Sequence, residues 1–98
     1  MEKKDEYVEK LKTQIDEWSA EIDKLEAKVK KTKADTQMGY ENQIKSLRQR
    51  YDSAKAKLAE IQQASETSWE DLKQGAETAW GALKEGLEKA KSRFKQQP

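Results

Sequence analysis

The sequence predicts an all-α protein built from elongated coiled-coil helices that form a single unit over residues 1–98. Three observations support this fold class. Apolar residues recur at alternating spacings of three and four, 40% of the residues are charged, and the single proline is the last residue. Such spacings place apolar side chains on one narrow stripe of a helix. Because only 34% of the residues are hydrophobic, narrow seams between helices are the form of core that this composition favours.

The first seam lies in the N-terminal part of the chain, on a helix that we expect to begin at residue 3. Its apolar positions are Val8, Leu11, Ile15, Trp18, Ile22, Leu25 and Val29. This is the a and d pattern of a coiled coil, and the residues between these positions are mostly charged. The pattern predicts a helix with one apolar edge and an otherwise solvated surface.

A second seam follows after an interruption. Thr32 and Thr36 occupy positions where apolar residues belong, and the pattern then resumes at Tyr40, Ile44, Leu47, Tyr51, Ala54, Leu58 and Ile61. Gly39 and the lysines of residues 28–33 favour a helix end here, whereas the absence of proline and the good helix formers on both sides favour continuity. We expect one continuous helix over residues 3–63. The alternative is a break near residues 33–38, which would give a three-helix bundle.

A break near residues 62–67 is better marked. The seam is lost there, and Thr67 with Glu70 matches a capping box, in which an N-cap hydroxyl and a carboxylate three residues later satisfy free backbone N–H groups. Acidic residues open the segment that follows and basic residues close it, an order that complements the helix dipole. We therefore expect a final helix over residues 67–95.

This final helix contains an eleven-residue repeat, because residues 68–78 and 79–89 share Trp, Leu, Lys, Gly and Glu at matching positions. An eleven-residue period keeps the apolar positions on a nearly straight stripe. The large residues of that stripe are Trp69, Leu72, Trp80, Leu83, Leu87 and Phe94. Gly75 and Gly86 lie beside it, where they either permit a close approach of another helix or provide flexibility.

The continuous-helix arrangement has a consequence for assembly. A helix over residues 3–63 would be about 90 Å long, so a 67–95 helix folded back on residues 40–61 would leave the Val8–Val29 seam uncovered. This version predicts self-association or a helical protein partner. The three-helix alternative permits a monomer.

Several kinds of chemistry find no support in the composition. The chain has no Cys and no His, which removes thiolate nucleophiles, zinc ribbons and the usual general base. Carboxylates such as Glu21, Asp23 and Glu26 do not have the spacing of a calcium loop. We therefore expect neither an enzyme nor a bound cofactor or metal. With 20 basic and 19 acidic residues, the sequence also lacks the basic stripe typical of nucleic-acid binding.

Three parts of the sequence resemble a bacterial family of small coiled-coil proteins known as stress-response or uncharacterised proteins. They are residues 4–12 together with Ile15–Trp18, the Trp-Glu-Asp-Leu-Lys of residues 69–73, and the Ala-Trp-Gly-Ala-Leu and Lys-Ser-Arg-Phe of residues 79–83 and 91–94. The resemblance covers nearly the whole chain and implies a cytoplasmic helical protein linked to stress. It supplies no catalytic or binding residues. The eleven-residue period is also similar to that of exchangeable apolipoproteins.

Two functional hypotheses follow. The first is a non-enzymatic structural or interaction protein that acts through its apolar seams. The second is an amphipathic protein that binds a membrane surface, with Trp69 and Trp80 at headgroup depth. Interfacial helices need a broad apolar face and a strongly basic polar face, whereas this stripe is narrow and its polar face carries both signs. The sequence therefore favours protein packing. No apolar run is long enough to span a bilayer and no leader pattern begins the chain, so we expect a cytoplasmic location.

Overall fold

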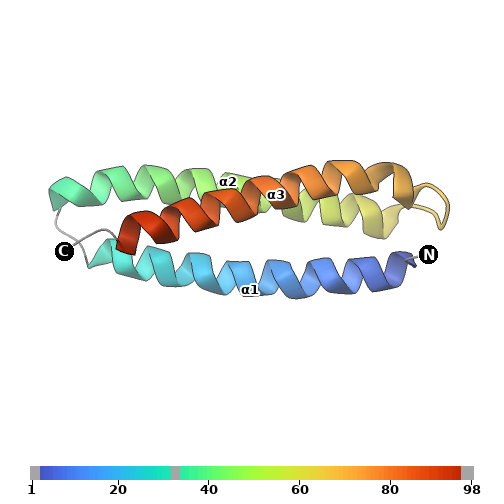
Figure 1. Cartoon of the computed structure of the whole chain (residues 1–98), viewed down its shortest axis with the longest axis horizontal. Helices are drawn as coiled ribbons and strands as arrows, with labels where there is room; N and C mark the ends of the chain where they lie inside the picture. Colours follow the sequence, from blue (N-terminus) through green and yellow to red (C-terminus); the bar gives the residue numbers. More distant parts are fainter. Residues whose placement is uncertain (1–2, 32–33, 96–98) are drawn as a thin grey trace.

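The protein is a bundle of three helices in the computed structural model, which describes residues 3–31 and 34–95 and leaves the side chains of residues 34–36, 94 and 95 outside that description. The helices are α1 (Lys4–Lys30), α2 (Ala34–Gln63) and α3 (Trp69–Lys95). They lie along one axis, with α2 antiparallel to α1 and α3 (Figure 1). The bundle measures 51 × 17 × 17 Å. The all-α prediction is confirmed.

The continuous helix over residues 3–63 is wrong, and the three-helix alternative describes the chain. Helix α1 ends at Lys30, and the backbone N–H of Lys31 donates to the carbonyl oxygens of Lys28 and Val29. The next helix begins at Ala34, at the start of the break expected near residues 33–38. Thr32 and Lys33 lie outside the described residues.

The lengths of the helices explain why the break is favourable. The three helices contain 27, 30 and 27 residues, so each is about 40–45 Å long and can cover its neighbours from end to end. A continuous helix would leave about half of its seam in water, and burial of apolar surface contributes roughly 25 cal/mol per Å². Folding at residue 31 buries both seams within one chain.

The break between α2 and α3 is closed by two serines. The backbone N–H of Ser68 donates to Ser65 Oγ at 3.1 Å, and the backbone N–H of Ser65 donates to Ser68 Oγ at 3.1 Å. This reciprocal pair is the geometry of a capping box. The expected cap at Thr67 and Glu70 is therefore wrong, because the box forms two residues earlier and Thr67 lies inside the turn.

A lysine connects the start of α1 to the end of α2. Lys4 Nζ donates to the carbonyl oxygens of Gln62 at 3.0 Å and Ala64 at 2.7 Å. The last carbonyls of a helix have no partner within the helix, so the ammonium group satisfies acceptors that the end of α2 leaves free.

The core runs the full length of the bundle between the three helices. Its largest fully buried side chains are Ile22, Leu47, Ile61 and Leu83, so all three helices contribute. Helix α2 packs extensively against both α1 and α3, whereas α1 and α3 contact each other much less. The α1–α3 side is therefore the open side of the bundle.

The glycines of α3 differ in their surroundings. A Cβ built on Gly86 would lie 2.8 Å from Arg50 Nη1 and 3.3 Å from Leu47 Cδ1, whereas one on Gly75 would make only ordinary contact with Lys57. Gly86 therefore permits a close approach of α2. For Gly81 nothing lies within 4 Å of the added atom, so no packing reason requires glycine there.

We expect Gly81→Ala to raise the free energy of unfolding by about 1 kcal/mol, because alanine loses less backbone entropy in a helix and meets no neighbour. Urea denaturation followed by circular dichroism measures this change. Gly86→Ala is the matched control. Its free energy of unfolding should rise clearly less, since the added methyl group displaces Arg50. Equal gains at the two positions would show that Gly86 is not a packing site.

Candidate functional site

The predicted seam of α1 faces the interior of the bundle. Val8, Leu11, Ile15, Ile22, Leu25 and Val29 are buried, and Trp18 is half-buried against the same core. The expectation of self-association rested on this seam being uncovered, and α2 and α3 cover it here. The seam is therefore part of the core of a single chain.

The predicted stripe of α3 also faces the interior of the bundle. Trp69, Trp80, Leu83 and Leu87 are buried, and Leu72 is half-buried against the core. Helix α3 extends through Phe94, but the Phe94 side chain lies outside the described residues. The second seam is also interior, with Tyr51 its one half-buried member.

Two aromatic pairs connect α1 with α3. The rings of Tyr7 and Trp69 are 5.5 Å apart between centroids, and those of Trp18 and Trp80 are 6.2 Å apart. Both pairs are tilted, at 39° and 45°, which is a favourable arrangement for aromatic rings. The two pairs are eleven residues apart on each helix, from Tyr7 to Trp18 in α1 and from Trp69 to Trp80 in α3. The repeat of α3 therefore matches two positions of α1.

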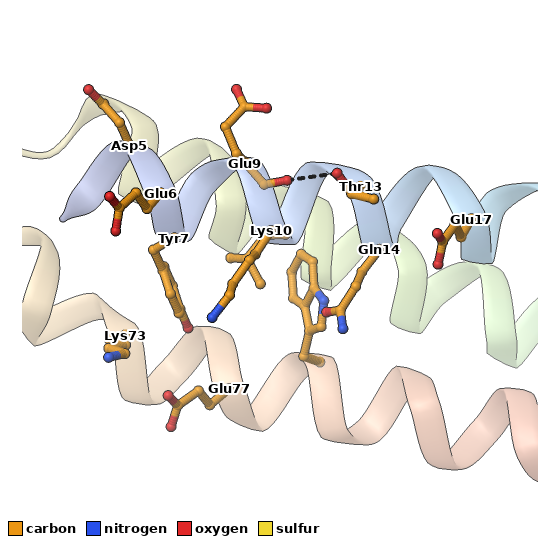
Figure 2. A pocket seen from close by; sticks show the side chains of 12 residues that line it. Asp5, Glu6, Tyr7, Glu9, Lys10, Thr13, Gln14, Glu17, Lys73 and Glu77 are labelled. Atoms are coloured by element: carbon orange, nitrogen blue, oxygen red, sulfur yellow. Dashed lines mark hydrogen bonds between the residues drawn. The ribbon is translucent and has the colours of Figure 1, made fainter. Parts of the chain in front are cut away.

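An open groove lies between α1 and α3 near the start of both helices (Figure 2). Its volume is about 1150 Å³, and Tyr7, Leu11 and Trp80 are among the residues that line it. Figure 2 shows Lys10 and Gln14 directed from α1 toward α3. The volume of the groove exceeds those of three other pockets among the described residues, which are about 180, 360 and 460 Å³.

The groove has an excess of negative charge. Its lining residues include Glu6, Glu17 and Glu77 against Lys10 and Lys73. Asp5 and Glu9 also belong to the lining, but Figure 2 shows their carboxylates directed away from α3. Lys73 Nζ lies 5.1 Å from the centre of the Tyr7 ring and 5.8 Å from that of Trp69, so its charge is partly matched by two aromatic faces. A cationic ligand would therefore experience a net attraction.

The sequence pattern does not predict a site at these polar residues. Glu6, Lys10, Gln14 and Glu17 occupy helix positions between the seam residues and were interpreted as solvated surface. A polar residue beside a groove follows the same sequence pattern as one on open surface. Only the packing of α1 and α3 on α2 distinguishes the two.

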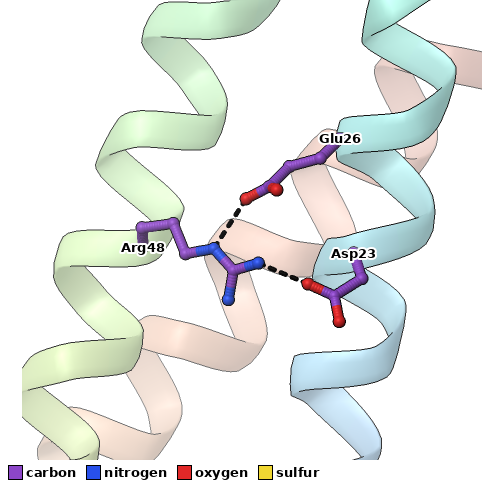
Figure 3. Close-up of polar contacts among 3 residues, drawn as sticks. All are labelled: Asp23, Glu26 and Arg48. Atoms are coloured by element: carbon purple, nitrogen blue, oxygen red, sulfur yellow. Dashed lines mark hydrogen bonds and ion pairs between the residues drawn. The ribbon is translucent and has the colours of Figure 1, made fainter.

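A second polar site connects α1 with α2. Arg48 donates through Nε to Glu26 at 2.6 Å and through Nη2 to Asp23 at 2.5 Å (Figure 3). The hydrogen bonds, first to Glu26 and then to Asp23, raise the pKa of the Arg48 guanidinium. Glu21 in turn forms an ion pair with Lys91 of α3. These three carboxylates therefore hold the helices together, and the described residues contain no cluster suited to a metal ion.

The two tyrosines of the second seam, Tyr40 and Tyr51, have cationic partners within the chain. Arg48 lies over the Tyr51 ring at 5.8 Å, and Arg93 lies over the Tyr40 ring at 5.1 Å. Tyr40 is buried and Tyr51 is half-buried against the core. Both rings therefore serve packing between helices.

Comparisons of this chain with models of protein families, with curated proteins and with solved structures gave no match. Across the described residues, no helix combines the length and the apolar character needed to cross a membrane. The described residues form a three-helix bundle in which two seams and the stripe of α3 face the interior, with an acidic groove between α1 and α3.

Proposed function

We propose that this protein is a non-enzymatic interaction protein that binds a basic amphipathic helix of a partner protein in the α1–α3 groove. The observation that carries the proposal is the groove itself. The seams on which the sequence-based hypothesis relied are buried within the chain, so they are not available to a partner unless the bundle opens. The groove leaves the edges of three buried apolar side chains at the surface, since Tyr7, Leu11 and Trp80 are 7%, 6% and 7% exposed.

The shape of the groove supports a helix as the occupant. Its α1 lining extends from residue 5 to residue 17, which corresponds to about 20 Å, or between three and four helical turns. Two parallel helices packed on a third leave a valley between them, and a fourth helix packs into such a valley at an axial distance of about 8–10 Å. The occupied complex would be a four-helix bundle.

The charge of the groove supports a basic partner. Glu6 and Glu17 of α1 line one wall of the groove, and Glu77 of α3 lies on the opposite wall. Lysine or arginine side chains flanking an apolar stripe would meet these carboxylates while the stripe covers the small parts of Leu11 and Trp80 that the core leaves exposed. Complementary charge favours association and excludes acidic helices from the same groove.

A stress-related role and a cytoplasmic location belong to this proposal on the strength of the sequence resemblance alone. The lipid-surface alternative has less support, because Trp69 and Trp80 are only 3% and 7% exposed. A lipid role would require α3 to detach from the core.

The test uses two synthetic amphipathic peptides of about 16 residues with the same leucine stripe. One carries lysine on its polar face and the other carries glutamate. We expect the lysine peptide to bind the intact protein in a saturable one-to-one complex, measured by calorimetry, and the glutamate peptide not to bind. The double variant Glu6→Lys with Glu77→Lys should lower the affinity for the lysine peptide at least tenfold, since it reverses two groove charges.

The matched control is Asp52→Lys combined with Glu41→Lys, which makes the same change of charge on exposed positions of α2. It should leave the affinity within about twofold if binding is local. Equal weakening by both double variants, or binding of neither peptide, would contradict the proposal. Light scattering on the free protein provides a further check, because a concentration-dependent dimer that the groove variant abolishes would identify a second copy as the occupant.

A further inference from the structure

A separate pocket lies on the opposite side of α3, between α2 and α3. Its volume is about 360 Å³, and it is lined by residues between 39 and 50 of α2 and between 86 and 93 of α3. This size falls within the range of small-molecule sites. It shares no lining residue with the α1–α3 groove.

Three cationic side chains meet at this pocket, and none of its lining residues is acidic. The cations are Arg50 of α2 and Lys89 and Arg93 of α3. Arg50 Nη1 donates to the carbonyl oxygen of Ala82 at 2.8 Å, and Arg93 lies over the Tyr40 ring. Both guanidinium groups are thereby held in place, which reduces the entropy lost when a ligand binds.

The neutral polar side chains around the pocket can also form hydrogen bonds. Ser46, Asn42 and Gln43 supply a hydroxyl and two amide groups. Gln43 Oε1 is buried and has no hydrogen-bond partner among the described residues. Because this oxygen is inaccessible, Ser46 and Asn42 are the neutral side chains that can contribute donors to an anion in the pocket.

Glycines leave the space open. Gly39 of α2 and Gly86 of α3 both line the pocket. A Cβ on Gly86 would lie 3.2 Å from Arg50 Cδ and even closer to Nη1, so a larger residue would push the Arg50 side chain from its position. The glycine that allows α2 and α3 to approach also lets Arg50 reach across α3.

We propose that this α2–α3 pocket binds a small phosphate-bearing anion, held by Arg50, Lys89 and Arg93. Arginine presents paired N–H donors that match two phosphate oxygens, and lysine adds a point charge. One competing carboxylate lies next to the site. Glu85 accepts a hydrogen bond from Lys89 at 3.0 Å, and this bond, with the charge of Arg50, lowers the pKa of the Glu85 carboxyl.

The test titrates the whole protein with inorganic phosphate and with pyrophosphate at low ionic strength, followed by calorimetry and by amide chemical shifts. We expect saturable one-to-one binding, with the largest shifts at Ser46, Gly86 and Lys89. The double variant Lys89→Gln with Arg93→Gln should weaken binding at least tenfold, because two charge-assisted contacts are lost. The control Lys12→Gln with Lys55→Gln removes equal charge from exposed positions outside the pocket and should change affinity by less than about twofold.

The variant Glu85→Gln tests whether Lys89 belongs to a ligand site or only to a charged surface. It frees Lys89 from its carboxylate partner, so pyrophosphate should bind several times more tightly, an effect that a purely structural role for Lys89 would not produce. The proposal is overturned if neither anion binds saturably, if the control double variant weakens binding as much as the pocket variant, or if only a nucleic-acid duplex binds.

Discussion

Replacing Ile22 with aspartate should leave the protein largely unfolded at 25 °C. Ile22 is completely buried at the centre of α1, and the described core contains no buried polar or charged residue that could pair with a new carboxylate. An unpaired buried charge, together with the lost apolar contacts, costs about 5 kcal/mol or more. A domain of this size has a total stability of roughly 5–15 kcal/mol, and a narrow bundle belongs near the lower limit.

The measurement is helicity by circular dichroism, with urea denaturation of any folded fraction. Ala27→Asp is the matched control, since it introduces the same residue into the same helix at an exposed position. The control should lose no more than about 1 kcal/mol, from helix propensity. A fully helical Ile22→Asp variant with an unchanged midpoint would show that the α1 seam is not the core.

The second large effect concerns Trp80, which joins the core, the Trp18 pair and the groove. Trp80→Ala should lower the free energy of unfolding by about 3–5 kcal/mol, the usual cost of removing a large buried side chain. The same variant should bind the lysine peptide described above more weakly, because the groove loses part of its apolar lining. Urea denaturation measures the first change and calorimetry at a stabilising temperature measures the second.

Trp80→Phe provides the contrast that identifies the cause. Trp80 Nε1 is buried without a hydrogen-bond partner among the described residues, and such a donor costs about 1–3 kcal/mol. Phenylalanine removes this donor and keeps an aromatic ring against Trp18, so its stability should lie within about 1 kcal/mol of the original protein. A loss as large as that of Trp80→Ala would mean that the indole N–H does have a stabilising partner.

The apolar periodicity was a reliable guide to the core because helical geometry alone decides which residues share a face. Spacings of three and four placed Val8 and Val29 on one stripe, and both are buried in the structure. The same reasoning placed Trp69 and Leu83 on the interior side of α3. The boundary between α2 and α3 was also predicted, since loss of the seam and a cluster of hydroxyl residues coincide there.

Local signals left the break after α1 undecided, because the lysines of residues 28–33 and Gly39 favour a helix end whereas other features favour continuity. The sequence around residue 32 contains neither proline nor a glycine turn pair, and the propensities on both sides favour helix. What decides the break is that a second helix of similar length buries about 40 Å of seam. This stabilisation comes from contacts between distant parts of the chain, so the residues near the break do not reveal it. Similarly, the cap at Ser65 rather than Thr67 depends on where the turn between α2 and α3 has to close.

The sequence by itself determined the all-α fold, the three apolar stripes and the balance of charge, because each follows from residue type and helical period. Tertiary structure alone decided which surfaces remain free. The α1–α3 groove exists because α1 and α3 each pack mainly on α2, and the α2–α3 pocket exists because Gly86 lets Arg50 reach across α3. Both sites are lined by polar residues whose sequence pattern is that of ordinary helix surface, so only the packing of the helices distinguishes them.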